Sequence, residues 1–213
     1  MKLDNRGLLI VLSGPSGVGK GTVRSALFDM PGHDLVYSVS MTTRAPRKGE
    51  VDGREYYFVT REEFEKRIQE NKFLEYAEFV NHYYGTPADI VEKQLAEGKE
   101  VVLEIEVQGA LQVRKKLKDD AIFIFIAPPS ISALYERLKA RGTESIEIVN
   151  ARYEKAMREI KLAYLYDYIV VNDTVENAAD KIMAIIRAEH AKTERTIAEY
   201  NKLLGITEMN KKG

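Results

Sequence analysis

Unbroken apolar runs alternate with helix-forming segments along most of this chain. The first run, residues 8–12, ends at once in Ser13-Gly14-Pro15. An aliphatic run without polar alternation predicts a strand that is buried on both faces. A helix is predicted over residues 20–30, because Pro31-Gly32 stops it. The first unit is therefore a strand, a glycine-rich loop and a helix.

The alternation of strands and helices continues in the second half of the chain. Further buried strands are predicted at residues 101–107, 122–127 and 168–171. Arginine-bearing helical segments are predicted at residues 130–141 and 145–162, and a long amphipathic helix from about residue 175. This order is typical of an α/β fold with a parallel sheet flanked by helices.

Residues 37–98 have a different character, which predicts a lobe inserted into the α/β core. Short strands are predicted at residues 37–40 and 55–59, on either side of a charged segment that contains Pro and Gly. We expect this lobe to carry its own small sheet.

Two helix starts are predicted inside the lobe. Thr60 and Glu63 fit a capping box that opens a helix to about residue 70. Thr86 and Pro87 predict the N-cap and first position of a second helix, which ends near Gly98.

Composition limits the function classes. A length of 213 residues favours one folding unit, and the net charge of −1 gives no general attraction to nucleic acid or to an anionic membrane. The chain has no cysteine, which excludes disulfides, zinc-thiolate sites and a thiol nucleophile and fits a reducing compartment. We expect a cytoplasmic protein that binds neither nucleic acid nor membrane, since no apolar run is long enough to span a bilayer.

The glycine-rich loop is the first chemical motif. It reads Gly14-Pro15-Ser16-Gly17-Val18-Gly19-Lys20 and fits Gly-x-x-x-x-Gly-Lys between a strand and a helix. Such a P-loop directs backbone N–H groups and the helix N-terminus at phosphates, while the lysine reaches the outer phosphates. Gly21 stands where most P-loops have the Ser or Thr that binds Mg²⁺, and Thr22 follows it. Direct Mg²⁺ coordination by this loop is therefore not expected.

A second motif identifies the phosphoryl acceptor. Residues 42–59, TTRAPRKGEVDGREYYFV, resemble the guanylate kinase signature at every fixed position. The resemblance to that family also includes Phe73-Leu74-Glu75-Tyr76 and Tyr83-Tyr84-Gly85-Thr86, and it covers about residues 7–190. It implies a P-loop nucleoside monophosphate kinase that phosphorylates GMP.

The resemblance implies a set of acceptor-binding residues. Arg44 and Arg47 would clamp the dianionic phosphate of GMP, because planar guanidinium groups pair well with phosphate oxygens. Tyr56 and Tyr84 would donate hydroxyl hydrogen bonds to the same phosphate. Around the base the resemblance places Ser40, Glu75, Thr86 and Glu106. Guanine presents N1–H and an exocyclic amine, two donors that the carboxylates at Glu75 and Glu106 would select.

Two glutamates are predicted close to the reacting groups. Glu104 and Glu106 lie two apart on a predicted strand, so both side chains should point to one face near its carboxyl end, where ligands of parallel sheets bind. Glu104 stands in the place of a Walker-B-like acid and would orient Mg²⁺ through water.

The helical segment after residue 128 resembles the lid of the family, whose arginines close over the transferring phosphoryl group. Arg137 and Arg141 lie four apart on a predicted helix and so share one face, and Arg152 follows on the next helix. Asn172 matches the position that contacts the adenine of ATP. The catalytic set is therefore expected to be Lys20, Arg44, Arg137, Arg141 and Arg152.

The sequence thus predicts ATP- and Mg²⁺-dependent phosphorylation of GMP and dGMP. The expected parts are a core (residues 7–36, 99–127 and 164–213), a GMP-binding lobe (residues 37–98) and a lid (residues 128–163). Two alternatives remain open, another nucleoside monophosphate kinase and a non-catalytic guanylate-kinase-like protein-binding module. The amphipathic segment after residue 189 could pack on the core or on a second subunit of a homo-oligomer.

Overall fold

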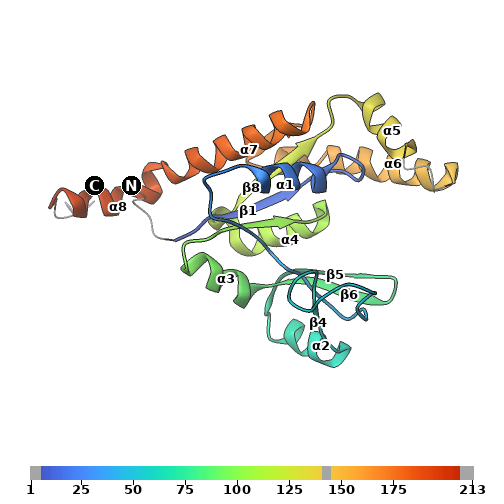
Figure 1. The fold of residues 1–213 in the computed structure, drawn as a ribbon, viewed down its shortest axis with the longest axis horizontal. Coiled ribbons are helices and arrows are strands. Elements are labelled where there is room, and N and C mark those ends of the chain that lie inside the picture. Colours follow the sequence, from blue (N-terminus) through green and yellow to red (C-terminus); the bar gives the residue numbers. More distant parts are fainter. Residues whose placement is uncertain (1–5, 141–144, 207–213) are drawn as a thin grey trace.

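A five-stranded parallel sheet forms the core of the computed structural model, which describes residues 6–140 and 145–206. Its spatial order is β2-β7-β1-β8-β9, and every neighbouring pair is parallel. The strands are β1 (Leu9–Ser13), β2 (Leu35–Tyr37), β7 (Glu100–Glu104), β8 (Ile122–Ala127) and β9 (Tyr168–Val171). The predicted α/β fold with a parallel sheet is confirmed, and Figure 1 shows helices above and below this sheet.

Helices bury both faces of the core sheet, which explains the unbroken apolar run of β1. Ile10 and Leu12 face one apolar cluster, which also holds residues of α1 (Lys20–Asp29) and α7 (Val175–His190). Leu9 and Val11 face the other, with residues of α3 (Ala88–Ala96) and α4 (Val107–Leu117). Because side chains alternate along a strand, a strand covered on both faces needs apolar residues at every position.

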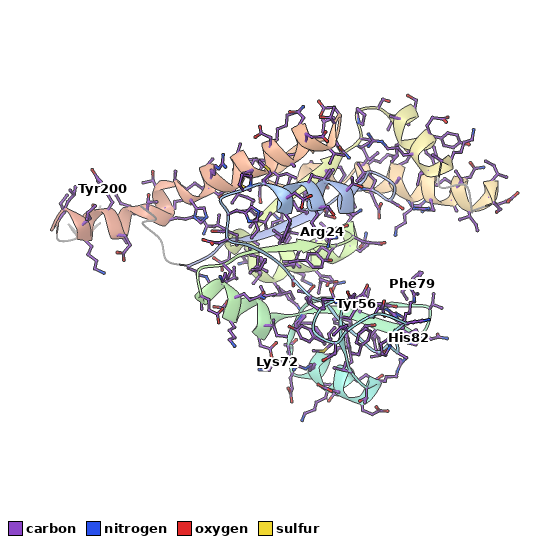
Figure 2. All side chains as sticks on the ribbon, in the orientation of Figure 1. Arg24, Tyr56, Lys72, Phe79, His82 and Tyr200 are labelled. Carbon is purple, nitrogen blue, oxygen red and sulfur yellow. The ribbon has the colours of Figure 1, made fainter. Side chains whose placement is uncertain are left out.

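A second, four-stranded sheet lies below the core in Figure 1, in the order β4-β3-β6-β5. Its strands are β3 (Met41–Thr42), β4 (Tyr57–Phe58), β5 (Phe73–Phe79) and β6 (His82–Pro87). Phe64 of helix α2 (Arg61–Gln69) packs in one apolar cluster with the sheet residues Met41 and Phe73. Figure 2 labels Tyr56, Phe79 and His82 in this part of the molecule. We call these strands and α2 the lobe.

Helices α5 (Ile131–Lys139) and α6 (Ile146–Ile160) form a separate pair, which we call the lid helices. They share a small apolar cluster of their own, made by Leu134, Leu138, Val149 and Ala156. Short 3-10 turns at Lys118–Asp120 and Ala163–Leu165 precede β8 and β9. In Figure 1 the lid helices lie above the β5–β6 hairpin, and both extend toward the right of the picture.

Two predicted strands have other boundaries in the structure. The strand expected at residues 37–40 is β2, which ends at Tyr37 and belongs to the core sheet because Tyr37 pairs with Val102 of β7. The strand expected at residues 101–107 ends at Glu104, and Glu106 is instead the N-cap residue of α4. Glu104 and Glu106 therefore do not share a strand face.

Of the two helix starts predicted in the lobe, one is confirmed and the other is wrong. The Thr60 hydroxyl accepts a hydrogen bond from Glu63 N at 3.2 Å, which confirms the start of α2. The predicted N-cap role of Thr86 is wrong: Thr86 lies in β6, Pro87 occupies the N-cap position of α3, and the Thr86 hydroxyl donates to Glu75. Thr86 lies one residue too early to cap α3, because its backbone is still paired with Glu75 in the lobe sheet.

The C-terminal helical segment divides into α7 and α8 (Thr193–Leu203). Helix α8 buries none of its residues, and it extends away from the core sheet in Figure 1, with Tyr200 labelled on it in Figure 2. Helix α8 therefore does not pack into the core, whereas α7 does. Within residues 6–140 and 145–206, no helix is long and apolar enough to cross a membrane.

The turn between β5 and β6 generates a stability prediction. Val80 and Asn81 have φ values of 49° and 60°, so a β-branched residue occupies a left-handed position of a type I′ turn. Val80 is 71% exposed and loses little packing on truncation. We expect Val80→Gly to raise the free energy of unfolding by about 0.5–1 kcal/mol, and the melting temperature by roughly 2–4 °C.

The control for this substitution is Val51→Gly at another exposed valine, outside the residues with positive φ. Thermal unfolding should show a lower melting temperature for this control, because glycine only adds entropy to the unfolded chain there. A lower melting temperature for Val80→Gly as well would contradict the assignment of strain to the turn.

Candidate functional site

The P-loop follows β1 at the carboxyl edge of the core sheet. Gly14, Gly17 and Gly19 have φ values of 151°, 85° and 94°, in which a side chain is strained. A Cβ on Gly14 would lie 2.3 Å from the carbonyl oxygen of Ile126 in β8. The glycines of the motif are therefore needed both for the turn and for the close approach of two backbones.

A cavity of about 380 Å³ opens above this loop, and we call it the P-loop pocket. It is lined by Gly14, Ser16, Gly17, Gly19, Lys20, Gly21, Thr22, Glu104, Ile105, Glu106, Arg152 and Glu159. Seven of the predicted ATP-binding residues are in this set, whereas Pro15 and Val18 are not, and Val18 is fully buried.

Lys20 is the cation that the P-loop itself contributes to the P-loop pocket. Its Nζ donates to the carbonyl of Gly14 at 2.7 Å. Burial lowers the pKa of Lys20, and the neighbouring carboxylates of Glu159 and Glu104 act in the opposite direction. These carboxylates favour the charged ammonium, which a phosphate ligand needs.

Helix α6 holds one residue of the loop from two directions. The Arg152 guanidinium donates to Ser16 Oγ at 2.9 Å, and Glu159 Oε2 accepts from Ser16 N at 3.3 Å. Arg152 and Glu159 are seven residues apart, so they lie on one face of the helix. Burial raises the pKa of the Glu159 carboxyl. The lid helices are thus in direct contact with the P-loop.

Arg137 and Asn172 lie behind the loop rather than in its pocket. Arg137 donates to the carbonyls of Val18 at 3.2 Å and Asn172 at 3.1 Å, and Asn172 Nδ2 donates to the Val18 carbonyl at 2.8 Å. Asn172 is only 3% exposed, and its Oδ1 is buried without a hydrogen-bond partner. Arg141, the third predicted lid arginine, lies outside the described residues.

A second cavity, of about 560 Å³, separates the lobe from the core, and we call it the lobe pocket. Five of the predicted acceptor residues line it, namely Ser40, Tyr56, Glu75, Tyr84 and Glu106. The rings of Tyr56 and Tyr84 meet edge to face, 5.9 Å apart. The structure therefore brings together side chains from β5, β6, the start of α4 and the loop before β3.

Glu75 is the buried carboxylate of the lobe pocket. It is 8% exposed, and its Oε1 accepts from the Thr86 hydroxyl at 2.6 Å. Burial raises the pKa of Glu75, and the hydrogen bond from Thr86 opposes that shift. A carboxylate kept in such a place can accept hydrogen bonds from a ligand that offers N–H donors.

The two predicted phosphate-binding arginines do not line either cavity. The Arg44 guanidinium donates to both Glu50 carboxylate oxygens, at 2.8 and 2.9 Å, and lies 5.5 Å from the ring centre of Tyr56. Glu50 also accepts from Arg47 N at 2.7 Å. Glu50 thereby orients the Arg44 side chain beside the tyrosine that lines the lobe pocket.

The two cavities meet at one wall, made by Glu104, Ile105 and Glu106. Glu104 pairs with Arg24 at 3.2 Å, and Glu106 pairs with Lys155 of α6 at 2.6 Å. A group held in the P-loop pocket and a group held in the lobe pocket would therefore face each other across this wall. The arrangement suits transfer of a phosphoryl group between two bound molecules.

The side chains at this wall fit an Mg²⁺ ion that is carried mainly by phosphate. In the described part of the chain, no group of three or more His, Cys, Asp or Glu side chains could hold a metal ion. Glu104 Oε1 is 3.6 Å from the position that a Cβ on Gly21 would take. Mg²⁺ at kinase sites keeps several waters and takes only one or two protein carboxylates. A single carboxylate at Glu104 is therefore sufficient.

Some residues that line the two cavities or pair with their lining residues were missed by sequence reasoning. Glu159 and Lys155 look like surface charges of an amphipathic helix, although the seven-residue spacing from Arg152 to Glu159 was a usable signal. Gly109 lies inside α4, where glycine costs about 1 kcal/mol relative to alanine. A glycine in such a place indicates a close approach, here to Glu75.

The loop generates a prediction that distinguishes two of its glycines. A Cβ on Gly19 would combine a φ of 94° with a contact of 2.9 Å to Asn172 Nδ2, whereas Gly21 has an ordinary φ in α1 and no contact under 3.6 Å. We expect Gly19→Ala to lower the free energy of unfolding by about 2 kcal/mol, and Gly21→Ala to raise it by about 0.5 kcal/mol. Urea unfolding of both variants checks this, and equal stabilities would contradict it.

Comparisons with known proteins show the family of the chain. The family model described as guanylate kinase matches residues 6–189. Guanylate kinase of Onion yellows phytoplasma (strain OY-M) is 61% identical over 204 residues, 96% of each chain. Guanylate kinase of Bacillus subtilis (strain 168) is 55% identical over 204 residues, 96% of this chain and 100% of the other.

One solved structure supports the same assignment. The crystal structure of guanylate kinase from Anaplasma phagocytophilum has a TM-score of 0.74 at 36% identity, with 98% of this chain and 100% of that chain covered. The fold, the two adjoining cavities and these sequence matches together establish that this chain belongs to the guanylate kinase family.

Proposed function

We propose that this chain transfers the γ-phosphoryl group of ATP to GMP, and also to dGMP, and releases ADP and GDP or dGDP. The observation that carries the proposal is the wall of Glu104, Ile105 and Glu106, which a phosphate-binding pocket and a base-binding pocket share. Membership of the guanylate kinase family supports the same assignment.

The P-loop pocket is the proposed site of the donor, ATP. Backbone N–H groups of residues 16–22 and the N-terminus of α1 would surround the phosphates, and Lys20 would move from the Gly14 carbonyl to a phosphate oxygen. Arg137, Arg141 and Arg152 are proposed to neutralise charge on the transferring group. Asn172 is proposed to contact the adenine, although its buried amide would first have to leave Val18.

The lobe pocket is the proposed site of the acceptor, GMP. Glu75 and Glu106 would accept hydrogen bonds from the guanine N1–H and exocyclic amine, with Ser40 and Thr86 beside them. Tyr56 and Tyr84 would donate to the phosphate, and Arg44 and Arg47 would pair with its oxygens. Adenine has an exocyclic amine but no N1–H, so one of the two carboxylates would be left without a donor.

The proposed mechanism is direct in-line transfer by positioning and charge neutralisation. The acceptor phosphate oxygen attacks the γ-phosphorus, the bond to the β,γ-bridging oxygen breaks, and ADP leaves. Bound Mg²⁺ would neutralise phosphate charge, and Glu104 would hold it through water. Lys20 and the arginines stabilise the charge that spreads over the transferring oxygens, and closure of the lid and lobe would exclude water.

The proposal assigns one task to each part of the chain. The core (residues 7–36, 99–127 and 164–213) would hold ATP, the lobe (residues 37–98) GMP, and the lid (residues 128–163) would close over both. Helix α3 falls within residues 37–98, yet its Val91 and Leu95 pack in a core cluster. The moving part of the lobe is therefore expected to be its four-stranded sheet with α2.

A substrate survey tests the activity. With ATP and Mg²⁺ present, we expect phosphorylation of GMP and dGMP, and rates for AMP and UMP at least 100-fold lower because the carboxylate acceptors lack partners. Lys20→Ala should lower kcat by roughly 100-fold or more, since a preorganised cation is lost. Equal rates on AMP would favour another nucleoside monophosphate kinase, and no turnover with any acceptor would favour a protein-binding module.

Glu75 generates a prediction with opposite effects on stability and on binding. Its pKa in the folded protein is raised by burial, so the free energy of unfolding falls as the pH rises through that pKa. Glu75→Gln removes this penalty while it keeps the acceptor for Thr86. We expect its melting temperature at pH 7.5 to rise on the order of 2 °C, and its KM for GMP to rise about tenfold.

The pH dependence distinguishes removal of the buried Glu75 charge from a general effect of the substitution on stability. The gain in melting temperature should shrink as the pH falls through the raised pKa, because Glu75 then becomes neutral in the native protein as well. Thermal unfolding between pH 5 and 8 and GMP kinetics of both proteins supply the data. A stability difference that is constant over this range would contradict the raised pKa of Glu75. An unchanged KM for GMP would remove Glu75 from base recognition.

A further inference from the structure

One face of α4 lies along β5, the strand that carries Glu75. Gln112 Oε1 accepts from Tyr76 N at 3.2 Å, and Gln112 Nε2 donates to the Tyr76 carbonyl at 3.0 Å. One turn further, Lys116 Nζ donates to the carbonyl of Phe73 at 2.6 Å. One turn earlier, Gly109 faces the Glu75 carboxylate. We call these contacts the α4–β5 clasp.

The clasp satisfies backbone groups that the lobe sheet cannot pair. β5 is an edge strand, so the groups of Tyr76 that point away from β6 lack a neighbouring strand. The Gln112 amide offers one acceptor and donors, as a peptide unit of another strand would. Without it, Tyr76 N–H and C=O would have to find water at a partly covered edge.

The clasp also lies where β5 changes register. Phe73 pairs with Pro87 but Glu75 pairs with Thr86, so β5 advances two residues while β6 advances one. Such a bulge re-aims the side chains that follow it. Phe73 consequently packs in the lobe cluster, while Glu75 turns toward α4 and the lobe pocket. The direction of the Glu75 carboxylate therefore depends on how this bulge is held.

Gly109 shows how little freedom the carboxylate has. A Cβ on Gly109 would lie 3.0 Å from Glu75 Oε2, closer than side chains normally pack. Glu75 is thus confined between the helix backbone at Gly109 and the hydroxyl of Thr86. A small shift of β5 relative to α4 would move it against one of these neighbours.

We propose that Gln112 is a positioning residue for GMP recognition, which it serves by fastening the bulged strand β5 so that Glu75 meets the guanine donors. The inference rests on the proposed function, because it takes the lobe pocket as the GMP site. Gln112 lines the lobe pocket, but its amide oxygen and nitrogen are both bonded to Tyr76, so it acts through Tyr76 and Glu75. The clasp fixes the acceptor side alone. The P-loop pocket contains no residue of α4.

The test is Gln112→Met, a variant of similar size that can make neither hydrogen bond. We expect KM and Kd for GMP to rise about tenfold, while kcat and KM for ATP stay within about twofold of the wild type. Gln69→Met on the exposed surface of α2 is the matched control and should change none of these values. A simple loss of folded protein would lower kcat and would leave KM for GMP unchanged.

Gly109→Ala is an independent second variant. Alanine favours the helix, so a folded protein is expected, yet the added Cβ presses on Glu75 and should raise KM for GMP selectively. Unchanged GMP binding in both variants, or equal rises in KM for GMP and ATP, would overturn the role of the clasp.

If the wild type binds GMP without phosphorylating it, the proposed activity fails while calorimetric Kd values still decide on the clasp. Wild-type protein that does not bind GMP overturns both.

Discussion

Parallel strands end at the same edge of a sheet, and this constraint determines where the charges of the protein meet. Leu12 pairs with Glu104, so the P-loop after β1 and the wall after β7 leave the sheet side by side. Asn172 follows β9 at the same edge and donates to Val18 beneath the loop. The apolar run of β1, buried on both faces, makes this edge rigid.

The site concentrates acidic groups in places where burial penalises their charge. The side chains of Glu75 and Glu159 are both buried, and burial raises the pKa of each carboxyl. Lys20, Lys155 and the Thr86 hydroxyl offset part of this cost. Carboxylates that are held partly unpaired are available to a ligand, so the protein gives up some stability for recognition.

Local signals in the sequence predicted the elements whose formation depends on neighbouring residues. The strand at residues 122–127 and the Thr60 cap were correct, because burial of an aliphatic run and satisfaction of a helix end are short-range demands. Thr86 was misread because its backbone pairs with Glu75, eleven residues earlier, which keeps it in β6 and leaves the N-cap position to Pro87. Glu106 was misread because a strand that continues into a helix start without a Gly or Pro gives no boundary signal.

The sequence by itself therefore indicated the family and the phosphate loop, and it predicted five residues that line the lobe pocket, since glycine spacing and donor chemistry are properties of short segments. Only the tertiary structure decided which side chains from distant parts of the chain are in contact. The bonds of Ser16 to Glu159 and of Gln112 to Tyr76 join residues 143 and 36 positions apart. Such contacts depend on how whole helices pack against sheets, and a side chain that makes them is chemically indistinguishable in the sequence from one on a solvated surface.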